Sequence, residues 1–91
     1  MKVRYGVCVL SQLDAIYTHI FEENPGAARS MIVGIRASIH LLGDFPQLGR
    51  ATDVADVRRL VLGARPYIAF YSICGGEVRI LRVLHGKQNT H

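Results

Sequence analysis

Residues 57–88 read VRRLVLGARPYIAFYSICGGEVRILRVLHGKQ, and this stretch decides the fold. It holds three short runs of alternating apolar residues, at 57–62, 66–73 and 77–84, which is the periodicity of half-buried β-strands. The pair Gly75-Gly76 separates the last two runs, and a two-residue glycine spacing is typical of a tight β-hairpin. The last third of the chain is therefore predicted to form a three-stranded antiparallel meander.

The two-residue turn also predicts how the last two strands pair. Counting outward from the turn, the expected cross-strand partners are Ile73 with Val78, Tyr71 with Ile80, Ala69 with Arg82 and Tyr67 with Leu84. This register sorts the side chains onto two faces of the sheet. The face that we expect a helical layer to cover holds Tyr67, Ala69, Tyr71, Ile73, Val78, Ile80 and Leu84.

The opposite face is apolar in its middle and polar toward its ends. It is expected to hold Ile68, Phe70, Ser72, Arg79, Leu81, Val83 and His85. A sheet covered on one side should not leave four large apolar residues in water. We therefore expect a partner protein to cover Ile68, Phe70, Leu81 and Val83, although it could instead lie across the helices.

The first quarter of the chain predicts a strand followed by a helix. Residues 3–10 read VRYGVCVL and alternate as a strand does, and Ser11 is placed to cap a helix that follows it. The next apolar residues recur at the i, i+3, i+4, i+7 and i+8 spacing of an amphipathic helix of about three turns. They are Leu13, Ile16, Tyr17, Ile20 and Phe21.

A second helix is predicted to begin directly after the first. Asn24 is a good helix cap and Pro25 suits a first helical position, while Gly43 is a natural helix stop. So short a joint predicts an antiparallel helical hairpin. Residues 45–50 have turn chemistry, and residues 51–56 form a polar connector without periodicity. The apolar stripe of the second helix is Ala28, Met31, Ile32, Ile35, Ile39 and Leu42.

Length and composition limit the class of protein. Ninety-one residues suit one compact domain, 1–91, of the α+β class. Cys8 and Cys74 lack the spacing of a metal or redox pair and are expected to be buried small apolar residues. Neither a signal peptide nor a membrane-spanning run is recognisable, so a cytoplasmic setting and no membrane partner are expected.

The charge of the chain favours anionic partners. The formal net charge is +4, and seven of the eleven basic residues lie at or after Arg50. A cationic field of this kind suits nucleic acid or an acidic protein segment. The ordinary alternative is a charged sheet edge that discourages aggregation. The basic residues expected at the rim of the sheet are Arg58, Arg59, Arg65, Arg79, Arg82 and Lys87.

No constellation typical of an enzyme stands out. The carboxylates are scattered and form no evident pair, no glycine-rich phosphate loop follows a strand, and no metal or cofactor site is predicted. His85, at the end of the last predicted strand, is the one titratable group that could serve as a general acid or base. The simpler interpretation is a histidine that bonds to nearby backbone.

The order of elements resembles the RelE/ParE superfamily, the toxic halves of bacterial type II toxin-antitoxin pairs, across nearly the whole chain. Several segments are similar to its ParE branch in particular. They are Asn24-Pro25 followed by Ala27-Ala28, FPQLGR at 45–50, Arg59-Leu60, YIAFYSI at 67–73 and VRILRVLHG at 78–86.

Resemblance to the ParE branch implies a plasmid-stabilization type of toxin that inhibits DNA gyrase by binding, without a catalytic site of its own. It also implies a ParD-like antitoxin whose C-terminal segment wraps the apolar grooves of the toxin, and no direct binding of DNA by the toxin alone. The residues that we expect to contact the target are Arg59, Arg65, Arg82, His85 and Lys87.

The RelE branch offers an alternative, a ribosome-dependent messenger RNA endonuclease. In that case His85 would be the acid or base, with Arg82 and Lys87 beside the cleaved phosphate. Ile68 and Gln88 stand where such nucleases often carry arginine, and this departure argues against the nuclease. A third possibility is a degenerate toxin that is kept only as an antitoxin-binding module.

Overall fold

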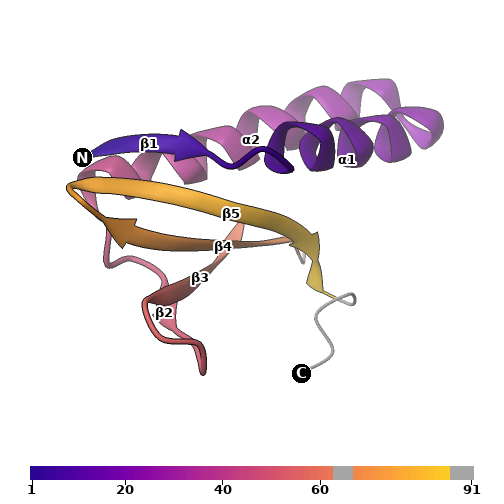
Figure 1. Ribbon diagram of the computed structural model, residues 1–91. Helices are drawn as coiled ribbons and strands as arrows, with labels where there is room; N and C mark the ends of the chain where they lie inside the picture. Colours follow the sequence, from indigo (N-terminus) through magenta and orange to yellow (C-terminus); the bar gives the residue numbers. More distant parts are fainter. Residues whose placement is uncertain (63–66, 87–91) are drawn as a thin grey trace.

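The computed structural model describes residues 1–62 and 67–86, and in these residues two helices lie on one face of a five-stranded sheet (Figure 1). The α+β architecture expected from the sequence is confirmed. In chain order the elements are β1 (Lys2–Tyr5), α1 (Val9–Glu23), α2 (Pro25–Asp44), β2 (Arg50–Ala51), β3 (Val57–Leu62), β4 (Tyr67–Cys74) and β5 (Glu77–His85).

The start of the chain differs from the prediction of a strand over 3–10. Strand β1 ends at Tyr5, and α1 begins at Val9, which is fully buried. The Gly6 amide donates to the Ile80 carbonyl at 2.9 Å, and the chain then turns away from the sheet. Ser11 is not the cap, because it already lies within α1. The alternation was misleading here because the helix must begin early to reach back over the sheet.

The joint between the helices is formed as predicted. The Asn24 Oδ1 atom accepts a hydrogen bond from the Ala27 amide at 3.1 Å, and Pro25 is the first residue of α2. The helices form an antiparallel hairpin, and its closed end extends past the sheet (Figure 1). Gly43 does not stop α2, which runs on to Asp44 and ends with Phe45 as its C-cap.

The strands lie in the order β1-β5-β4-β3-β2. The predicted meander of β3, β4 and β5 is antiparallel, and β1 adds to its edge parallel to β5. Strand β2 was missed, because two residues carry no periodic signal. It pairs with β3, so that Arg50 lies opposite Arg59 and Ala51 lies opposite Arg58.

The hairpin between β4 and β5 begins in the predicted register and then departs from it. Gly75 and Gly76 both adopt positive φ, at 59° and 76°, which the tight turn requires. Next to the turn, Ile73 pairs with Val78 and Tyr71 pairs with Ile80, as expected.

A β-bulge then inserts Leu81 into β5, because Tyr71 pairs with Ile80 whereas Phe70 pairs with Arg82. Beyond the bulge the prediction was wrong. Ala69 pairs with Val83 instead of Arg82, and Tyr67 pairs with His85 instead of Leu84. One extra residue exchanges the two faces of a strand. Val83 and His85 therefore face the helices, while Arg82 and Leu84 face outward.

The core lies between the helical hairpin and the sheet. Val83 is only 2% exposed and belongs to it, so the prediction that Val83 lies on the outer face was wrong. The buried residues that form the core cluster are Val9, Leu13, Ile35, Ile39, Leu42, Leu62, Tyr67, Ala69, Tyr71, Val78, Ile80 and Val83.

Two smaller features complete the fold. Cys8 and Cys74 are exposed, contrary to prediction, because one caps α1 and the other ends β4 beside the hairpin turn. Neither α1 nor α2 is long and apolar enough to cross a membrane.

Candidate functional site

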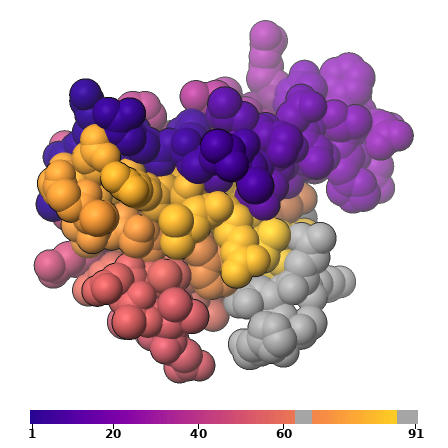
Figure 2. Space-filling model, in the orientation of Figure 1, coloured from indigo at the N-terminus to yellow at the C-terminus, as the bar shows by residue number. Residues whose placement is uncertain are grey.

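A groove opens on the sheet face opposite the helices, beneath the loop that joins β2 to β3. We call it the outer groove, and its volume is about 640 Å³. In Figures 1 and 2 this loop projects from the body of the protein, on the side away from the helices. The groove is lined by Ala51, Thr52, Asp53, Val54, Val57, Arg59, Phe70, Leu81, Arg82 and Leu84.

Local hydrogen bonds hold the loop over the groove. The Thr52 hydroxyl lies 2.9 Å from the Val57 carbonyl oxygen and accepts a bond from the Val54 amide at 3.1 Å. The Val57 amide in turn donates to the Val54 carbonyl at 3.2 Å. Asp56 has a φ of 64°, a conformation that aspartate tolerates better than most residues. The closed loop leaves Val54 63% exposed.

The segment that leads into β2 is tied to the core by Tyr71. Its buried hydroxyl accepts a hydrogen bond from the Gly49 amide and donates one to the Pro46 carbonyl, both at 2.8 Å. The Arg58 Nη1 atom donates to the Gly49 carbonyl at 2.7 Å. One wall of the outer groove is thus positioned by a residue of the opposite face of β4.

Three side chains of the groove lie in one row across the sheet. Arg59 on β3 pairs with Phe70 on β4, which pairs with Arg82 on β5. The Arg82 guanidinium carbon lies 5.8 Å from the centre of the Phe70 ring, a cation–π arrangement. Arg50 extends the row onto β2. The ion pairs found among residues 1–62 and 67–86 all involve Glu77, so these arginines keep their charge available.

The five residues predicted to contact the target do not all lie on the same face of the sheet. Arg59 and Arg82 share the outer groove, whereas Arg65 and Lys87 lie outside the described residues. His85 lies on the other face, where its ring meets the Tyr67 ring edge-on at 5.1 Å. The bulge at Leu81 causes this separation.

His85 lines a second cleft, of about 430 Å³, between α1 and the end of β5. The Gln12 Oε1 atom accepts a bond from the Val83 amide at 2.8 Å and holds the helix to the strand. Arg82 and His85 therefore project from opposite faces of β5. The acid–base and phosphate-binding pair suggested for a nuclease is not assembled from these two residues, and the third member, Lys87, is not described.

The four residues expected to contact an antitoxin do not all lie on one exposed surface. Phe70 and Leu81 line the outer groove, and Leu81 is 42% exposed. Ile68 points to the same face, but it is only 7% exposed between its neighbours Val61 and Leu84. Val83 is a buried core residue, so it is no longer expected to contact the antitoxin.

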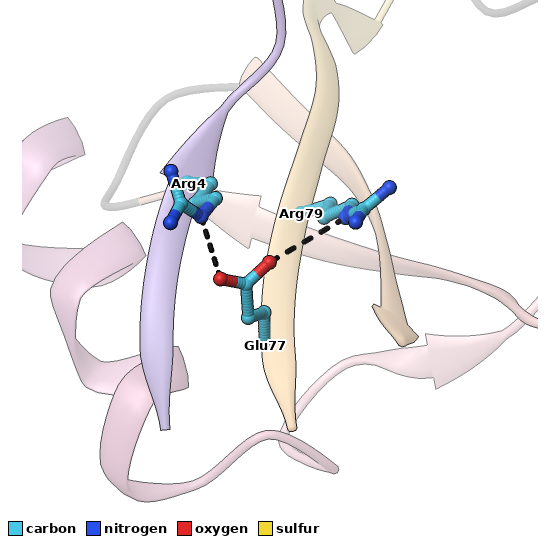
Figure 3. A network of polar contacts seen from close by, with 3 residues as sticks. All are labelled: Arg4, Glu77 and Arg79. Atoms are coloured by element: carbon cyan, nitrogen blue, oxygen red, sulfur yellow. Dashed lines mark hydrogen bonds and ion pairs between the residues drawn. The ribbon is translucent and has the colours of Figure 1, made fainter. Parts of the chain in front are cut away.

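A polar network that the sequence did not reveal joins β1 to β5 (Figure 3). The Glu77 carboxylate takes a hydrogen bond from the Arg4 Nε atom at 2.6 Å and lies 3.7 Å from the Arg79 Nε atom. The hydrogen bond from Arg4 is the main cause that lowers the pKa of Glu77 below its ordinary value, and the charges of Arg4, Arg79 and Lys2 act in the same direction. Glu77 thus fastens the edge strand.

The lowered pKa of Glu77 predicts a loss of stability in acid. A carboxyl whose folded pKa is depressed contributes stability above its unfolded pKa and loses it as pH falls through the folded value. We expect the unfolding free energy to fall as pH drops below about 5, the upper edge of the range in which an unfolded glutamate titrates. Glu77→Gln should reduce that dependence, as measured by urea unfolding between pH 7 and pH 3.

Glu22→Gln on α1 is the matched control, because it removes the same kind of carboxyl outside the network. It should keep the pH dependence of the natural protein. Equal pH dependence in the Glu77→Gln variant and the natural protein would contradict the assignment of the acid-sensitive stability to Glu77.

Within residues 1–62 and 67–86, no group of three or more histidine, cysteine, aspartate or glutamate residues is placed to hold a metal ion.

A strand, a helical hairpin and an antiparallel meander follow one another in the order expected from the resemblance to the RelE/ParE superfamily, and a groove with two arginines lies on the uncovered sheet face. Residues 3–90 match the model of the family described as "ParE toxin of type II toxin-antitoxin system, parDE". The chain therefore belongs to the ParE family of type II toxins.

Three similar proteins agree with this assignment. The chain is 33% identical over 87 residues to the protein Y4kP of Sinorhizobium fredii, covering 96% of this chain and 90% of that one. It is 32% identical over 84 residues to Toxin ParE3 of Caulobacter vibrioides, covering 89% and 82%. A structure described as the chromosomal ParDE TA system from P. aeruginosa superimposes with a TM-score of 0.84 at 28% identity, covering 93% of this chain and 95% of that one.

Proposed function

We propose that this toxin stops growth by binding DNA gyrase and that a ParD-like antitoxin neutralises it. The observation that carries the proposal is the outer groove, where Arg59 and Arg82 lie beside the apolar side chains of Phe70 and Leu81. Such a surface can dock a protein, whereas Arg82 and His85 point to opposite sides of β5. The match to a parDE family supports the antitoxin partnership.

In this proposal Arg59 and Arg82 are the first contacts with the target, because both lie on the exposed sheet face and neither is held in a described ion pair. Exposed cations steer association and select partners of opposite charge. Arg65, His85 and Lys87 remain candidates for the same role. Phe70 and Leu81, together with Ile68 on the same sheet face, are the proposed contacts of the antitoxin.

Inhibition of gyrase supercoiling by the purified protein is the expected result. The Arg59→Gln/Arg82→Gln variant should require at least about tenfold more protein for half inhibition, since each lost charge contact costs on the order of 1 kcal/mol or more. Arg29→Gln/Arg36→Gln, which removes the same charge from α2, is the control and should inhibit as the natural protein does. If supercoiling is unaffected at concentrations where expressing cells stop growing, gyrase is not the target.

Mapping of transcript ends after induction separates the proposal from the nuclease alternative. A gyrase inhibitor should induce the DNA-damage response without new ends inside translated codons. New ends within codons, lost in a His85→Ala variant, would instead identify a messenger RNA endonuclease. Harmless induction would identify a degenerate module that only binds its antitoxin.

A further inference from the structure

The sheet carries three cations around a single carboxylate at its β1 edge. Lys2 and Arg4 lie on β1 and Arg79 lies on β5, and we call these three residues the edge patch. Strand pairing places Lys2 opposite Glu77 and Arg4 opposite Arg79. Like charges in directly opposite positions destabilise a sheet, so the fold itself does not favour this arrangement. One glutamate also leaves two of the three positive charges uncompensated.

Both guanidinium groups of the edge patch keep donors free for a ligand. Arg4 uses its Nε atom for the bond to Glu77, whereas the Arg79 Nε atom, at 3.7 Å, is too far away for a hydrogen bond. In the part of the chain that the structure describes, the Nη atoms of these two arginines have no partner. Their side chains are 59% and 56% exposed, and the outer end of Arg79 points away from Glu77 in Figure 3. Free Nη atoms suit the binding of a phosphate group.

The donors of the patch lie in one row across the sheet. Glu77 holds the Arg4 side chain at 2.6 Å, which reduces the entropy that Arg4 loses when it binds a ligand. On the other side of Arg79 its β4 neighbour is Ser72, whose hydroxyl is a further donor. The row covers three adjacent strands, about 10 Å. That is the axial length of roughly three nucleotides of one DNA strand.

The surroundings of the patch favour nucleic acid over a protein ligand. Ser72, Cys74 and Glu77 lie next to the cations in the strand register, and none of them is a large apolar side chain of the kind that anchors protein interfaces. Contacts to phosphate need only charge and hydrogen-bond donors. The outer groove differs, because its lining includes Phe70 and Leu81.

The distribution of charge over the molecule directs a polyanion to the same face. Helices α1 and α2, which cover the opposite face, together carry four carboxylates and two arginines (Figure 1). The outer face holds the edge patch and, farther along the sheet, Arg59 and Arg82 of the groove. Such a field attracts a polyanion to the sheet and repels it from the helices.

We propose that the edge patch binds the phosphate backbone of duplex DNA. Three cations make a weak, salt-dependent contact that reads no sequence. This departs from the expectation that the toxin alone does not bind DNA, and the departure is largest at low salt. The contact is useful where a protein target already holds DNA. That this DNA is the DNA held by gyrase rests on the proposed function, in which the outer groove docks the protein while the edge patch meets the DNA.

The test follows the fluorescence anisotropy of a labelled duplex of about 20 base pairs, titrated with the toxin alone between about 50 and 200 mM salt. Lys2→Gln/Arg79→Gln should raise the Kd about tenfold at the lowest salt. It should also reduce the slope of log Kd against log salt concentration by about 2, because two phosphate contacts are lost. Arg4 is kept in this variant because it fastens β1. Thermal unfolding confirms that the fold is retained.

Arg29→Gln/Arg36→Gln is the matched control, since it removes the same charge from α2. Its Kd should stay within about threefold of that of the natural toxin. Unchanged binding in the patch variant, or an equal loss in this control, would overturn the inference. Polyglutamate is the probe for an acidic protein ligand. Displacement of the duplex by polyglutamate at an equal concentration of charge would assign the patch to acidic polypeptides instead.

Supercoiling assays separate this inference from the proposed function. Lys2→Gln/Arg79→Gln should need about fivefold more protein than the natural toxin for half inhibition at low salt, and added salt should narrow the difference. If this variant loses duplex binding but inhibits gyrase as well as the natural toxin does, the patch does not contact the DNA that gyrase holds. If the natural toxin does not inhibit gyrase, the proposed function fails, whereas duplex binding that is lost in the patch variant still supports the DNA site.

Discussion

Val83→Asp is expected to lower the free energy of unfolding by about 4 kcal/mol or more, a large fraction of the roughly 5–15 kcal/mol that holds a small domain folded. Val83 is 2% exposed within the core cluster. A carboxylate at this site would lose its hydration among the apolar residues of the core cluster. Urea unfolding followed by circular dichroism, or the soluble yield of the variant, measures the effect.

Leu81→Asp is the matched control two residues earlier in the same strand. Leu81 is 42% exposed at the bulge, so the same substitution should cost no more than about 1 kcal/mol. In a β5 without a bulge, residues 81 and 83 would share a face and the two variants would behave alike. Similar losses in both would therefore contradict the observed register.

Gly49→Ala is expected to be the second most damaging change, with a loss of about 3 kcal/mol. A methyl group on Gly49 would lie 2.6 Å from the Arg59 carbonyl oxygen and 2.7 Å from the ring and hydroxyl of Tyr71. Both neighbours resist displacement, since one is sheet backbone and the other is fully buried. The entry into β2 would shift, and the wall of the outer groove with it. Chemical denaturation measures the loss.

Tyr71→Phe removes the hydroxyl and its hydrogen bonds but keeps the ring, so it measures the contribution of the hydrogen bonds apart from that of packing. It leaves the Gly49 amide and the Pro46 carbonyl without their partner and should cost about 1–3 kcal/mol. Gly34→Ala in α2 is the control, because its added methyl meets no atom within 4 Å and alanine favours a helix. It should be neutral or stabilising. A Gly49→Ala variant as stable as Gly34→Ala would refute the close approach at Tyr71.

Much of the fold could be read from local patterns. The strand Val57–Leu62 was predicted with its observed bounds, and the Gly75-Gly76 turn was placed correctly. Asn24 and Pro25 predicted the joint of the hairpin, because capping and a restricted φ act within a few residues. Signals of this kind depend on chemistry that neighbouring residues supply by themselves.

The errors arose where distant segments decide the outcome. Residues 7–10 alternate as a strand does, yet α1 begins at Val9 because β1 can pair with β5 for only four residues before the chain crosses to the helical layer. The bulge at Leu81 left no signal either, since Ile80-Leu81 reads as an ordinary apolar pair. Strand β2 exists only because β3 offers it an edge.

In the candidate site too, the sequence identified single residues, whereas distant segments of the chain decided how they come together. Arg59, Arg82, Phe70 and Leu81 were each singled out from the sequence, but for two separate roles. The structure brings all four into one groove. The loop held by Thr52 and the network around Glu77 were missed, because their partners are set by strand order and by hydrogen bonds across the sheet.

The sequence by itself determined the class of fold, the helical hairpin, the meander and the cationic, half-apolar character of one sheet face. These follow from periodicity, capping and turn chemistry, which act over a few residues. Only the tertiary structure decided which residues share that face, because one inserted residue in β5 reverses the orientation of every side chain after it. That single step moved His85 and Val83 inward and set Arg82 beside Phe70 and Arg59.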